Sequence, residues 1–355
     1  MNSRFIQIIA DDLTGALDAA APFATPEQPM RLLLGNPSVD GLAELAGLTV
    51  SSASRDLDND DGDAALERAF AAISAPGVPP DRAPLHFAKV DSVLRGRPVA
   101  ETLARMQLWG ATTCLFAPAF PEMGRRTVNG HQETQIDGLW QPAAIHDIAS
   151  AFKRAGVDPM LRGEGDASVE PRSGMLIGDA TEARHLSAHV DALAHRLDVV
   201  WAGSRGLAEA IAGPAAPRPV PPIASVIVGT THPVTRHQVE LASTAGLFAT
   251  THLIDPVPEA QSADITRARV AAAVAELEPP TSRGLLVVGG DTLAVVLEAA
   301  GAQLLDCVGE VAPGVPLSYI KDGRFRGVPI LTKSGGFGAD DLLVRLLNRS
   351  DSGDV

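Results

Sequence analysis

Aromatic residues are scarce in this chain: only 4% of its 355 residues are Phe, Trp or Tyr, and one of them is a Tyr. Proteins that bind single-stranded nucleic acid rely on aromatic side chains interleaved with basic ones, so this composition argues against that class. Positive charge is also in deficit, because 43 acidic residues outnumber 29 Lys and Arg and give a net charge of −14. We therefore expect neither a nucleic acid nor an anionic membrane surface as a partner.

Cysteines and long apolar runs are rare as well. Cys114 and Cys307 lie far apart in the sequence, which is typical of a reduced interior rather than of a disulfide-linked secreted domain. No apolar segment approaches the roughly 18–20 residues needed to span a bilayer, and no signal peptide is apparent. We expect a soluble, cytoplasmic protein. The sequence leaves the oligomeric state open, although a homodimer is the commonest outcome.

Short apolar runs alternate along the chain with Ala- and Leu-rich segments in which apolar residues recur at helical spacing. This alternation predicts an α/β protein with mostly parallel sheets flanked by helices. Five prolines within 214–223 indicate a stiff linker. We therefore predict a Rossmann-like first domain over 1–213 and a second domain over 224–355. The expected strands are 5–9, 30–34, 48–51, 85–90, 113–117, 199–202, 225–228, 284–288 and 328–332.

Two adjacent carboxylates, Asp11 and Asp12, follow the first expected strand in the run Asp-Asp-Leu-Thr-Gly. Ligands of open α/β sheets bind at the carboxyl ends of strands, so these side chains are candidates to hold substrate hydroxyls, position a metal ion or act as a base. Alternatively, Asp12 only caps a helix over 13–21. A phosphatase of the haloacid-dehalogenase type is excluded, because Leu13 stands where the second Asp of its Asp-x-Asp pattern is required.

Further polar clusters follow later strands of the first half. One is Lys89, Val90, Asp91, Ser92 and Arg95. Its charges and hydrogen-bonding groups suit a ligand with a carboxylate and several hydroxyls, and a solvated surface turn is the alternative. Arg55 could add a second cation, and Arg125 projects from a Pro- and Gly-containing loop after the strand at 113–117. Such a loop is a weak signal by itself.

Glycine-rich turns follow three expected strands of the second half, at 229–230, 289–292 and 334–338. Glycines let a backbone approach phosphate, and free N–H groups at a helix start favour negative charge. The alternative is an ordinary turn in which Asp291 or Thr292 caps the following helix. The chain lacks both the Gly-x4-Gly-Lys-Ser/Thr pattern and a Gly-x-Gly-x-x-Gly turn in a strand–helix setting, so neither an ordinary P-loop nor a dinucleotide site is predicted.

Taken in order, the motifs at 10–16, 89–96 and 118–127 and the three glycine turns resemble the four-carbon acid sugar kinase family over nearly the whole chain. The resemblance implies that Asp11 or Asp12, Arg55 and the segment 89–92 bind a sugar acid. It implies ATP contacts at Thr230, Gly289, Gly290, Asp291, Thr292 and Gly335. Thr230 stands where the family commonly has Ser, and this retains the hydroxyl.

The expected reaction transfers the γ-phosphoryl group of ATP to the terminal hydroxyl of a four-carbon sugar acid, with Mg²⁺ neutralising the phosphates. Basic side chains would hold the acid's carboxylate and Asp side chains its hydroxyls. We take Asp12 and Asp91 as catalytic candidates, while the sequence leaves the base open among Asp11, Asp12, Asp91 and Asp291 and does not give the metal ligands. D-threonate, L-threonate, D-erythronate and 3-oxo-tetronate all remain possible substrates.

The region after Gly130 is shorter than is usual for this family and lacks its Asn-Pro-rich segment. This departure motivates an alternative from another class, a catalytically silent sensor that binds a sugar acid or a nucleotide without turnover. A redox enzyme is a distant third.

Overall fold

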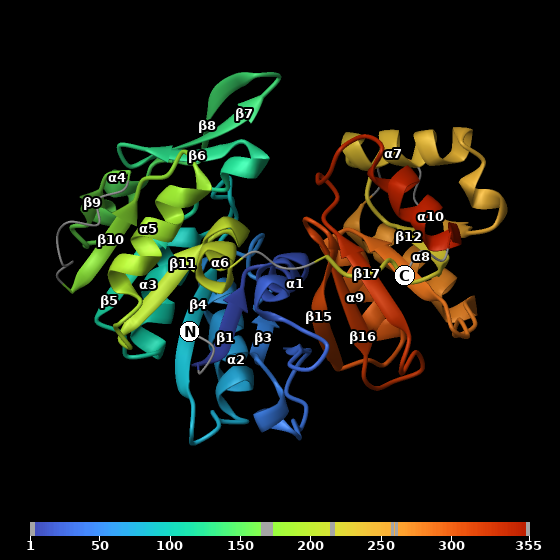
Figure 1. Ribbon diagram of the computed structural model, residues 1–355, viewed down its shortest axis with the longest axis horizontal. Helices are drawn as coiled ribbons and strands as arrows, with labels where there is room; N and C mark the ends of the chain where they lie inside the picture. Colours follow the sequence, from blue (N-terminus) through green and yellow to red (C-terminus); the bar gives the residue numbers. More distant parts are fainter. Residues whose placement is uncertain (1–3, 165–172, 214–216, 257–258, 260–261, 353–355) are drawn as a thin grey trace. The chain divides into compact units, whose positions relative to one another are not determined.

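The chain forms two compact units in a computed structural model that describes residues 4–164, 173–213, 217–256, 259 and 262–352 (Figure 1). The first unit comprises Met1–Phe23 and Ser38–Ala215, and the second comprises Ala24–Pro37 and Ala216–Val355. Two features differ from the division expected from the sequence: residues 217–223 of the expected linker lie in the second unit, and so does the segment Ala24–Pro37. The reason for the latter is long-range pairing, because β2 (Met30–Leu33) runs antiparallel to β15 (Leu304–Ala312). Residues 214–216 of the expected linker lie outside the described residues.

The first unit is built on a sheet of seven strands in the order β3-β1-β4-β11-β5-β10-β9, in which each neighbouring pair is parallel. Its strands are β1 (Arg4–Ala10), β3 (Gly47–Ser51), β4 (Ala83–Lys89), β5 (Thr113–Ala117), β9 (Met160–Arg162), β10 (Gly174–Gly178) and β11 (Val199–Gly203). Strands of such a sheet are covered on both faces, and β1 is accordingly buried from Phe5 to Ala10.

Helices connect these strands. They are α1 (Leu13–Ala20), α2 (Asn59–Ser74), α3 (Pro98–Leu108), α4 (Ile148–Arg154), α5 (Ala183–Leu193) and α6 (Arg205–Ala212), with 3-10 turns η1 (Ala21–Phe23), η2 (Leu42–Glu44) and η3 (Pro121–Met123). A separate antiparallel sheet, which the sequence did not predict, consists of β6 (Arg125–Val128), β7 (His131–Ile136) and β8 (Leu139–Asp147). It extends from the loop that follows β5 (Figure 1).

The sheet of the second unit has the order β13-β12-β14-β17-β16-β15-β2. Its first four strands are parallel and the rest antiparallel. The remaining strands are β12 (Ile223–Val228), β13 (His252–Ile254), β14 (Gly284–Val288), β16 (Val315–Ile320) and β17 (Pro329–Lys333). The helices are α7 (Pro233–Thr244), α8 (Ala263–Glu276), α9 (Gly290–Ala299) and α10 (Leu342–Ser352), with a 3-10 turn η4 (Leu247–Ala249).

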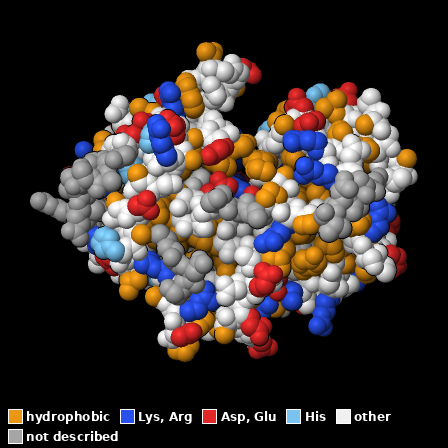
Figure 2. All heavy atoms as spheres, viewed as in Figure 1, with side chains coloured by type: hydrophobic (Ala, Val, Ile, Leu, Met, Phe, Trp, Pro, Cys, Tyr) orange, Lys and Arg blue, Asp and Glu red, His pale blue; other side chains and the backbone are white. Residues whose placement is uncertain are grey.

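The structure confirms the expected α/β fold class, and each of the nine predicted strands has a counterpart within a few residues. Both cysteines are buried and free of disulfide bonds. Within the described residues, no helix is both long and apolar enough to cross a membrane. On the face shown in Figure 2, Lys and Arg side chains are interspersed with acidic ones rather than gathered into one basic surface.

Candidate functional site

The first group of predicted residues lies at one edge of the parallel sheet. Ala10, at the end of β1, pairs with Ser51 of β3 and with Lys89 of β4, so these three strands end level with one another. The chain that leaves β1 leads to β3 on one side of it, whereas the chain that leaves β4 leads to β5 on the other side. Ligands of open α/β sheets bind in the crevice at such a switch point. The register therefore brings the segments that carry Asp11 and Arg55 to one place.

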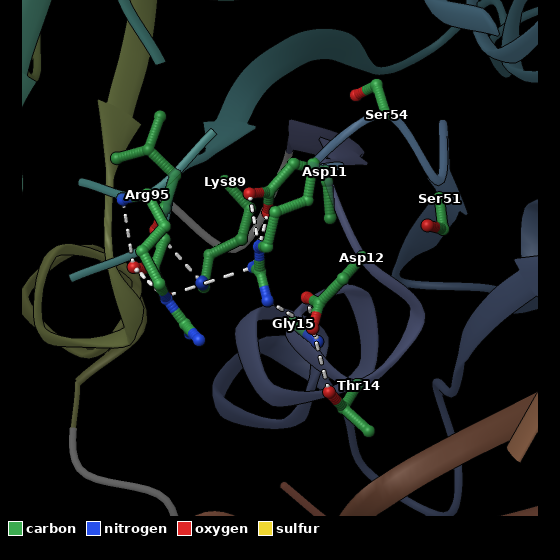
Figure 3. A network of polar contacts seen from close by, with 12 residues as sticks. Asp11, Asp12, Thr14, Gly15, Ser51, Ser54, Lys89 and Arg95 are labelled. Carbon is green, nitrogen blue, oxygen red and sulfur yellow. Dashed lines mark hydrogen bonds and ion pairs between the residues drawn. The ribbon is translucent and has the colours of Figure 1, made fainter. Parts of the chain in front are cut away.

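Arg55 binds both adjacent carboxylates. Its Nε donates to Asp11 Oδ2 and its Nη2 to Asp11 Oδ1, each over 2.8 Å, which is a bidentate pair. Its Nη1 donates to Asp12 Oδ2 over 2.8 Å, and Nη2 lies 3.9 Å from Asp91 Oδ1. One guanidinium thus contacts Asp11, Asp12 and Asp91. These carboxylates and the basic side chains around them form what we call the first-unit site, whose polar network is drawn in Figure 3.

Asp12 also caps a helix, as one of the two sequence interpretations predicted. Its Oδ1 accepts the N–H of Gly15 over 2.7 Å, and its Oδ2 accepts the hydroxyl of Thr14 over 3.0 Å (Figure 3). A Cβ at Gly15 would lie 2.2 Å from that Oδ1 and 3.4 Å from Lys89 Nζ, so a side chain there would displace the Asp12 carboxylate. The capping role is confirmed, and it leaves Oδ2 shared between Thr14 and the guanidinium of Arg55.

A buried polar network holds the loop that presents this guanidinium. Ala53 adopts a φ of 53°, in the left-handed region that residues with a Cβ rarely occupy. On either side of it, Ser52 Oγ lies 2.7 Å from Ser54 Oγ, and Ser54 donates to Glu101 Oε1 over 2.6 Å. Glu101 in turn pairs with Arg105 over 2.9 Å, and neither side chain is more than 2% exposed. No signal in the sequence marks these supporting residues.

The second loop carries the other predicted cations. Arg95 donates to Asp91 Oδ1 over 2.8 Å and to Oδ2 over 3.0 Å, while Lys89 Nζ is buried and donates to the Val90 carbonyl over 2.9 Å. The side chain of Val90 packs in the hydrophobic core, so only its backbone faces this network. The carbonyl of Ser92 accepts a hydrogen bond from Gln132 of β7.

Arg125, at the start of β6, is the fourth cation predicted for this site. Its Nη1 donates to the Met123 carbonyl, and its Nε is buried without a partner among the described residues. Burial lowers the pKa of Arg125, and the negative charge of Asp91 opposes that shift. An unsatisfied buried donor of this kind is costly, which fits a position where an acceptor from a ligand is needed.

The surroundings of Asp11 and Asp91, the two more buried carboxyl groups of this site, shift their pKa values in opposite directions. Burial raises the pKa of Asp11, although Arg55 and Lys89 oppose it. Burial also raises the pKa of Asp91, but the hydrogen bond from Arg95 and the charges of Arg55, Arg95 and Lys89 outweigh it and bring that pKa well below its usual range. The net effect for Arg55 is a raised pKa, since Asp12 and Asp11 outweigh its burial. Asp91 therefore stays ionised where Asp11 is more easily protonated.

The low pKa of Asp91 predicts a pH-dependent stability difference. A carboxyl whose pKa is depressed on folding contributes stability above its unfolded pKa of about 3.9, and this is lost as the pH falls through the folded pKa. We expect Asp91→Asn to lower the unfolding free energy by about 1–3 kcal/mol at pH 7, with a smaller difference near pH 3. Urea unfolding followed by Trp fluorescence measures this in the first unit, because Trp109, Trp140 and Trp201 all lie there.

The matched control for this prediction is Asp158→Asn, which removes an exposed carboxylate 3.5 Å from Lys153. Exposed ion pairs contribute little, so this variant should follow the wild type at both pH values. An equal loss at pH 7 and pH 3 for Asp91→Asn would contradict the assignment of its pKa.

The second group of predicted residues lies at a corresponding edge of the second unit. Val228 of β12 pairs with Val288 of β14, which pairs with Lys333 of β17. Each strand is followed at once by a glycine turn, at 229–230, 289–290 and 334–336. The three turns that the sequence singled out therefore lie side by side.

Close contacts and backbone conformation favour glycine where these turns meet. A Cβ on Gly229 would lie 2.4 Å from Thr292 Oγ1, and one on Gly335 would lie 3.0 Å from Thr230 Oγ1. Gly289 has a φ of 105°, which residues with a Cβ rarely adopt. The hydroxyls of Thr230 and Thr292 are thus held against the neighbouring glycine backbones.

The start of α9 offers free backbone donors to this edge. The N-cap is Gly289 and makes no side-chain capping bond, so the alternative in which Asp291 or Thr292 caps the helix is wrong. Thr292 is buried while Asp291 is exposed in the first turn. The uncapped N–H groups and the helix dipole give this end a positive potential that suits a phosphate.

The donor set at this edge can be tested against the expected Mg²⁺. Among the described residues, no group of three or more His, Cys, Asp or Glu is arranged to hold a metal ion. Mg²⁺ in phosphoryl-transfer sites usually needs only one or two carboxylates, because phosphates and waters complete its coordination. The exposed carboxylate of Asp291 beside the glycine turns fits that mode.

One further link at this edge was not evident from the sequence. Arg236 of α7 donates to the Thr230 carbonyl and also to Asp255, which follows β13. This fixes the turn after β12. No sequence signal marks these residues, because they are 19 positions apart and neither belongs to a motif.

Comparisons with known proteins agree with the two-unit structure. The family described as Sugar-binding N-terminal domain matches residues 6–211, more than half of the chain, and that described as Nucleotide-binding C-terminal domain matches residues 256–343. Two solved structures share the fold, one from Salmonella typhimurium LT2 (TM-score 0.74, 18% identity, 96% of this chain and 98% of that one) and one from Haemophilus influenzae (0.69, 17%, 98% and 99%).

Similar curated proteins span the whole chain. A protein of Bordetella bronchiseptica named D-threonate kinase is 28% identical over 97% of both chains. One of Cupriavidus necator with the same name is 29% identical over 95% of both, and one of Salmonella typhimurium is 24% identical over 95% of this chain and 96% of its own. With both domain families matched in order, the chain belongs to the four-carbon acid sugar kinase family.

Proposed function

We propose that this protein is an ATP-dependent kinase that phosphorylates the terminal hydroxyl of a four-carbon sugar acid of the threonate, erythronate or 3-oxo-tetronate class. As a member of this family it is an enzyme, a phosphotransferase with an alcohol group as acceptor. Three relatives are named D-threonate kinase, which makes D-threonate the first substrate to test.

The charge balance of the first-unit site carries this proposal. Its four cations are Arg55, Lys89, Arg95 and Arg125, and its three carboxylates are Asp11, Asp12 and Asp91. This leaves one positive charge in excess in a cluster whose side chains are mostly buried, apart from that of Arg95, which is 59% exposed. Buried charges need partners, and a ligand with a single carboxylate restores the balance. The carboxylate oxygens that remain accessible can accept hydrogen bonds from the hydroxyls of a sugar acid.

Roles for the three carboxylates follow from their environments. Asp91 is engaged by Arg95 and held ionised, so we assign it to orient a substrate hydroxyl. Asp11 is bound by both arms of Arg55 and is nearly inaccessible. Asp12 has the most exposed side chain of the three, at 23%. A base must be within hydrogen-bond reach of the proton that it accepts, and we therefore assign the base to Asp12.

The second unit would hold the nucleotide. The turns at Thr230, at Gly289 to Thr292 and at Gly335 present backbone donors and hydroxyls to the phosphates, as the uncapped start of α9 supports. Asp291 would supply a carboxylate to Mg²⁺, which neutralises phosphate charge during transfer when it is bound.

A coupled ADP-release assay with D-threonate, L-threonate, D-erythronate and 3-oxo-tetronate tests the proposal. We expect turnover with at least one of these acids and with ATP as donor. Ligand-induced thermal stabilisation without turnover above background would instead support the silent sensor. The comparisons do not favour that alternative, and Arg55 and Arg95 between them bind all three carboxylates of the first-unit site.

A further inference from the structure

Lys333, the last residue of β17, is a buried cation for which the sheet provides no counter-ion. It is 1% exposed, and the described residues contain no ion pair with its ammonium group. Burial lowers its pKa to about 8, and no charged neighbour contributes to that shift. Burying an unpaired ammonium is costly, so an apolar residue would stabilise this strand end better than Lys. The position of Lys333 therefore needs another explanation.

The contacts of Lys333 point to the glycine turn that follows it. Its Nζ donates to the Ser334 carbonyl over 2.9 Å and lies 3.3 Å from Thr235 Oγ1 in the first turn of α7. Thr235 is fully buried and donates to the Gly335 carbonyl over 2.5 Å. Two consecutive carbonyls of the turn are thus bound by these two side chains.

The hydrogen bonds to these two carbonyls fix the direction of the next two N–H groups. In a planar trans peptide, the C=O of one residue and the N–H of the next point in opposite directions. With the Ser334 and Gly335 carbonyls bound to Lys333 and Thr235, the N–H groups of Gly335 and Gly336 point away from those side chains. Within the described residues, neither N–H donates to another group. Successive free N–H groups of this kind form an anion-binding nest.

We propose that Lys333 and Thr235 are positioning residues that set the 334–336 turn so that the N–H groups of Gly335 and Gly336 bind a phosphate group of the nucleotide. The positive charge of Lys333 beneath the turn adds to the favourable potential. This inference rests on the proposed function, with ATP as the donor. It assigns phosphate recognition to two side chains that are buried below the turn rather than exposed at it.

Three variants test the inference. Lys333→Met removes the charge with little change in side-chain length. Thr235→Val removes the hydroxyl, whereas Thr235→Ser keeps it. We expect Lys333→Met and Thr235→Val to weaken ATP and ADP binding by about 10- to 100-fold, which is the contribution of one or two hydrogen bonds to a charged group. Adenosine binding should be unchanged, the KM for ATP should rise while the KM for the sugar acid stays constant, and Thr235→Ser should behave as the wild type.

The control is Lys321→Met, which removes an equal charge from the second unit at an exposed position paired with Asp306; it should leave ATP binding unchanged. A merely structural role for Lys333 and Thr235 would weaken adenosine and ATP equally. That result, or wild-type ATP affinity in both variants, would overturn the inference.

A proton-linkage measurement provides a second readout. A phosphate near the ammonium should raise the pKa of Lys333 from about 8, so ATP binding at pH 8 should take up protons in the wild type but not in Lys333→Met. Titration calorimetry in two buffers of different ionisation enthalpy measures this, and equal proton uptake in both proteins would count against the inference. If the wild type neither binds ATP nor releases ADP, the proposed function itself is wrong. If the wild type is active and the variants bind ATP as it does, only this inference is wrong.

Discussion

Replacing Asp12 by Asn should lower kcat by about 10²- to 10⁴-fold, the usual contribution of a general base, without unfolding the protein. Asn is as good an N-cap as Asp, so its side-chain oxygen can still accept the Gly15 N–H that now binds Asp12 Oδ1. What the substitution removes is the negative charge that faces Arg55 and the ability to accept a proton. Steady-state ADP release and thermal unfolding measure the two effects separately.

Asp147 provides a closely matched control for this prediction. It caps α4 in the same way, because it accepts the Ser150 N–H over 2.8 Å and the Ser150 hydroxyl over 2.6 Å. It belongs to no predicted site, so Asp147→Asn should leave kcat unchanged. If Asp12→Asn kept near-normal kcat, Asp12 would be only a helix cap and the base would have to be sought elsewhere.

Removing Arg55 should have the largest effect on stability. In Arg55→Met, Asp11 loses a bidentate partner and Asp12 a third bond, which leaves buried carboxylates uncompensated. Breaking a buried ion pair in this way costs about 3–5 kcal/mol. Because the pKa of Asp11, already raised by burial, would then lie still further above its unfolded value, the penalty should be greater at pH 7 than near pH 4. Urea unfolding monitored by Trp fluorescence measures the loss in the first unit.

Two further variants make this experiment specific. Arg55→Lys keeps the charge but not the fork, and it should retain more stability than Arg55→Met while still lowering kcat/KM. Arg184→Met removes an exposed Arg paired with Glu182 and should change the unfolding free energy by no more than about 1 kcal/mol. Arg55→Met unfolding at the wild-type urea concentration would show that the guanidinium does not hold the carboxylates together.

The Asp12 and Arg55 variants test two roles within the first-unit site, catalysis and the positioning of the carboxylates. Asp12 is accessible enough to reach a substrate, and Arg55 keeps it and Asp11 in place. The loop of Arg55 depends in turn on Glu101 and Arg105, which belong to no motif. A substitution in that buried pair would therefore be expected to disturb catalysis without touching the substrate.

Much of the site was predictable from local sequence. The apolar runs predicted nine of the described strands. Polar residues at the ends of 5–9 and 85–90, and glycines after 225–228, 284–288 and 328–332, marked the edges where we propose that ligands bind. Such signals are local, because a buried parallel strand needs consecutive apolar residues and a turn near phosphate needs glycine. The choice of Gly289 rather than Asp291 as the cap of α9 was not predictable, since a glycine cap and an Asp or Thr cap look alike in a sequence.

The sequence alone thus determined the fold class, nine of the described strands and the charged residues that meet in the first-unit site. The tertiary structure decided which strands are neighbours, that Ala24–Pro37 joins the second unit through β2, and that Arg55 binds carboxylates more than 40 positions away. It also showed that Lys333 and Thr235, 98 positions apart, lie together. The physical reason is that strand propensity and turn chemistry depend on neighbouring residues, whereas pairing and burial depend on which distant segments pack together.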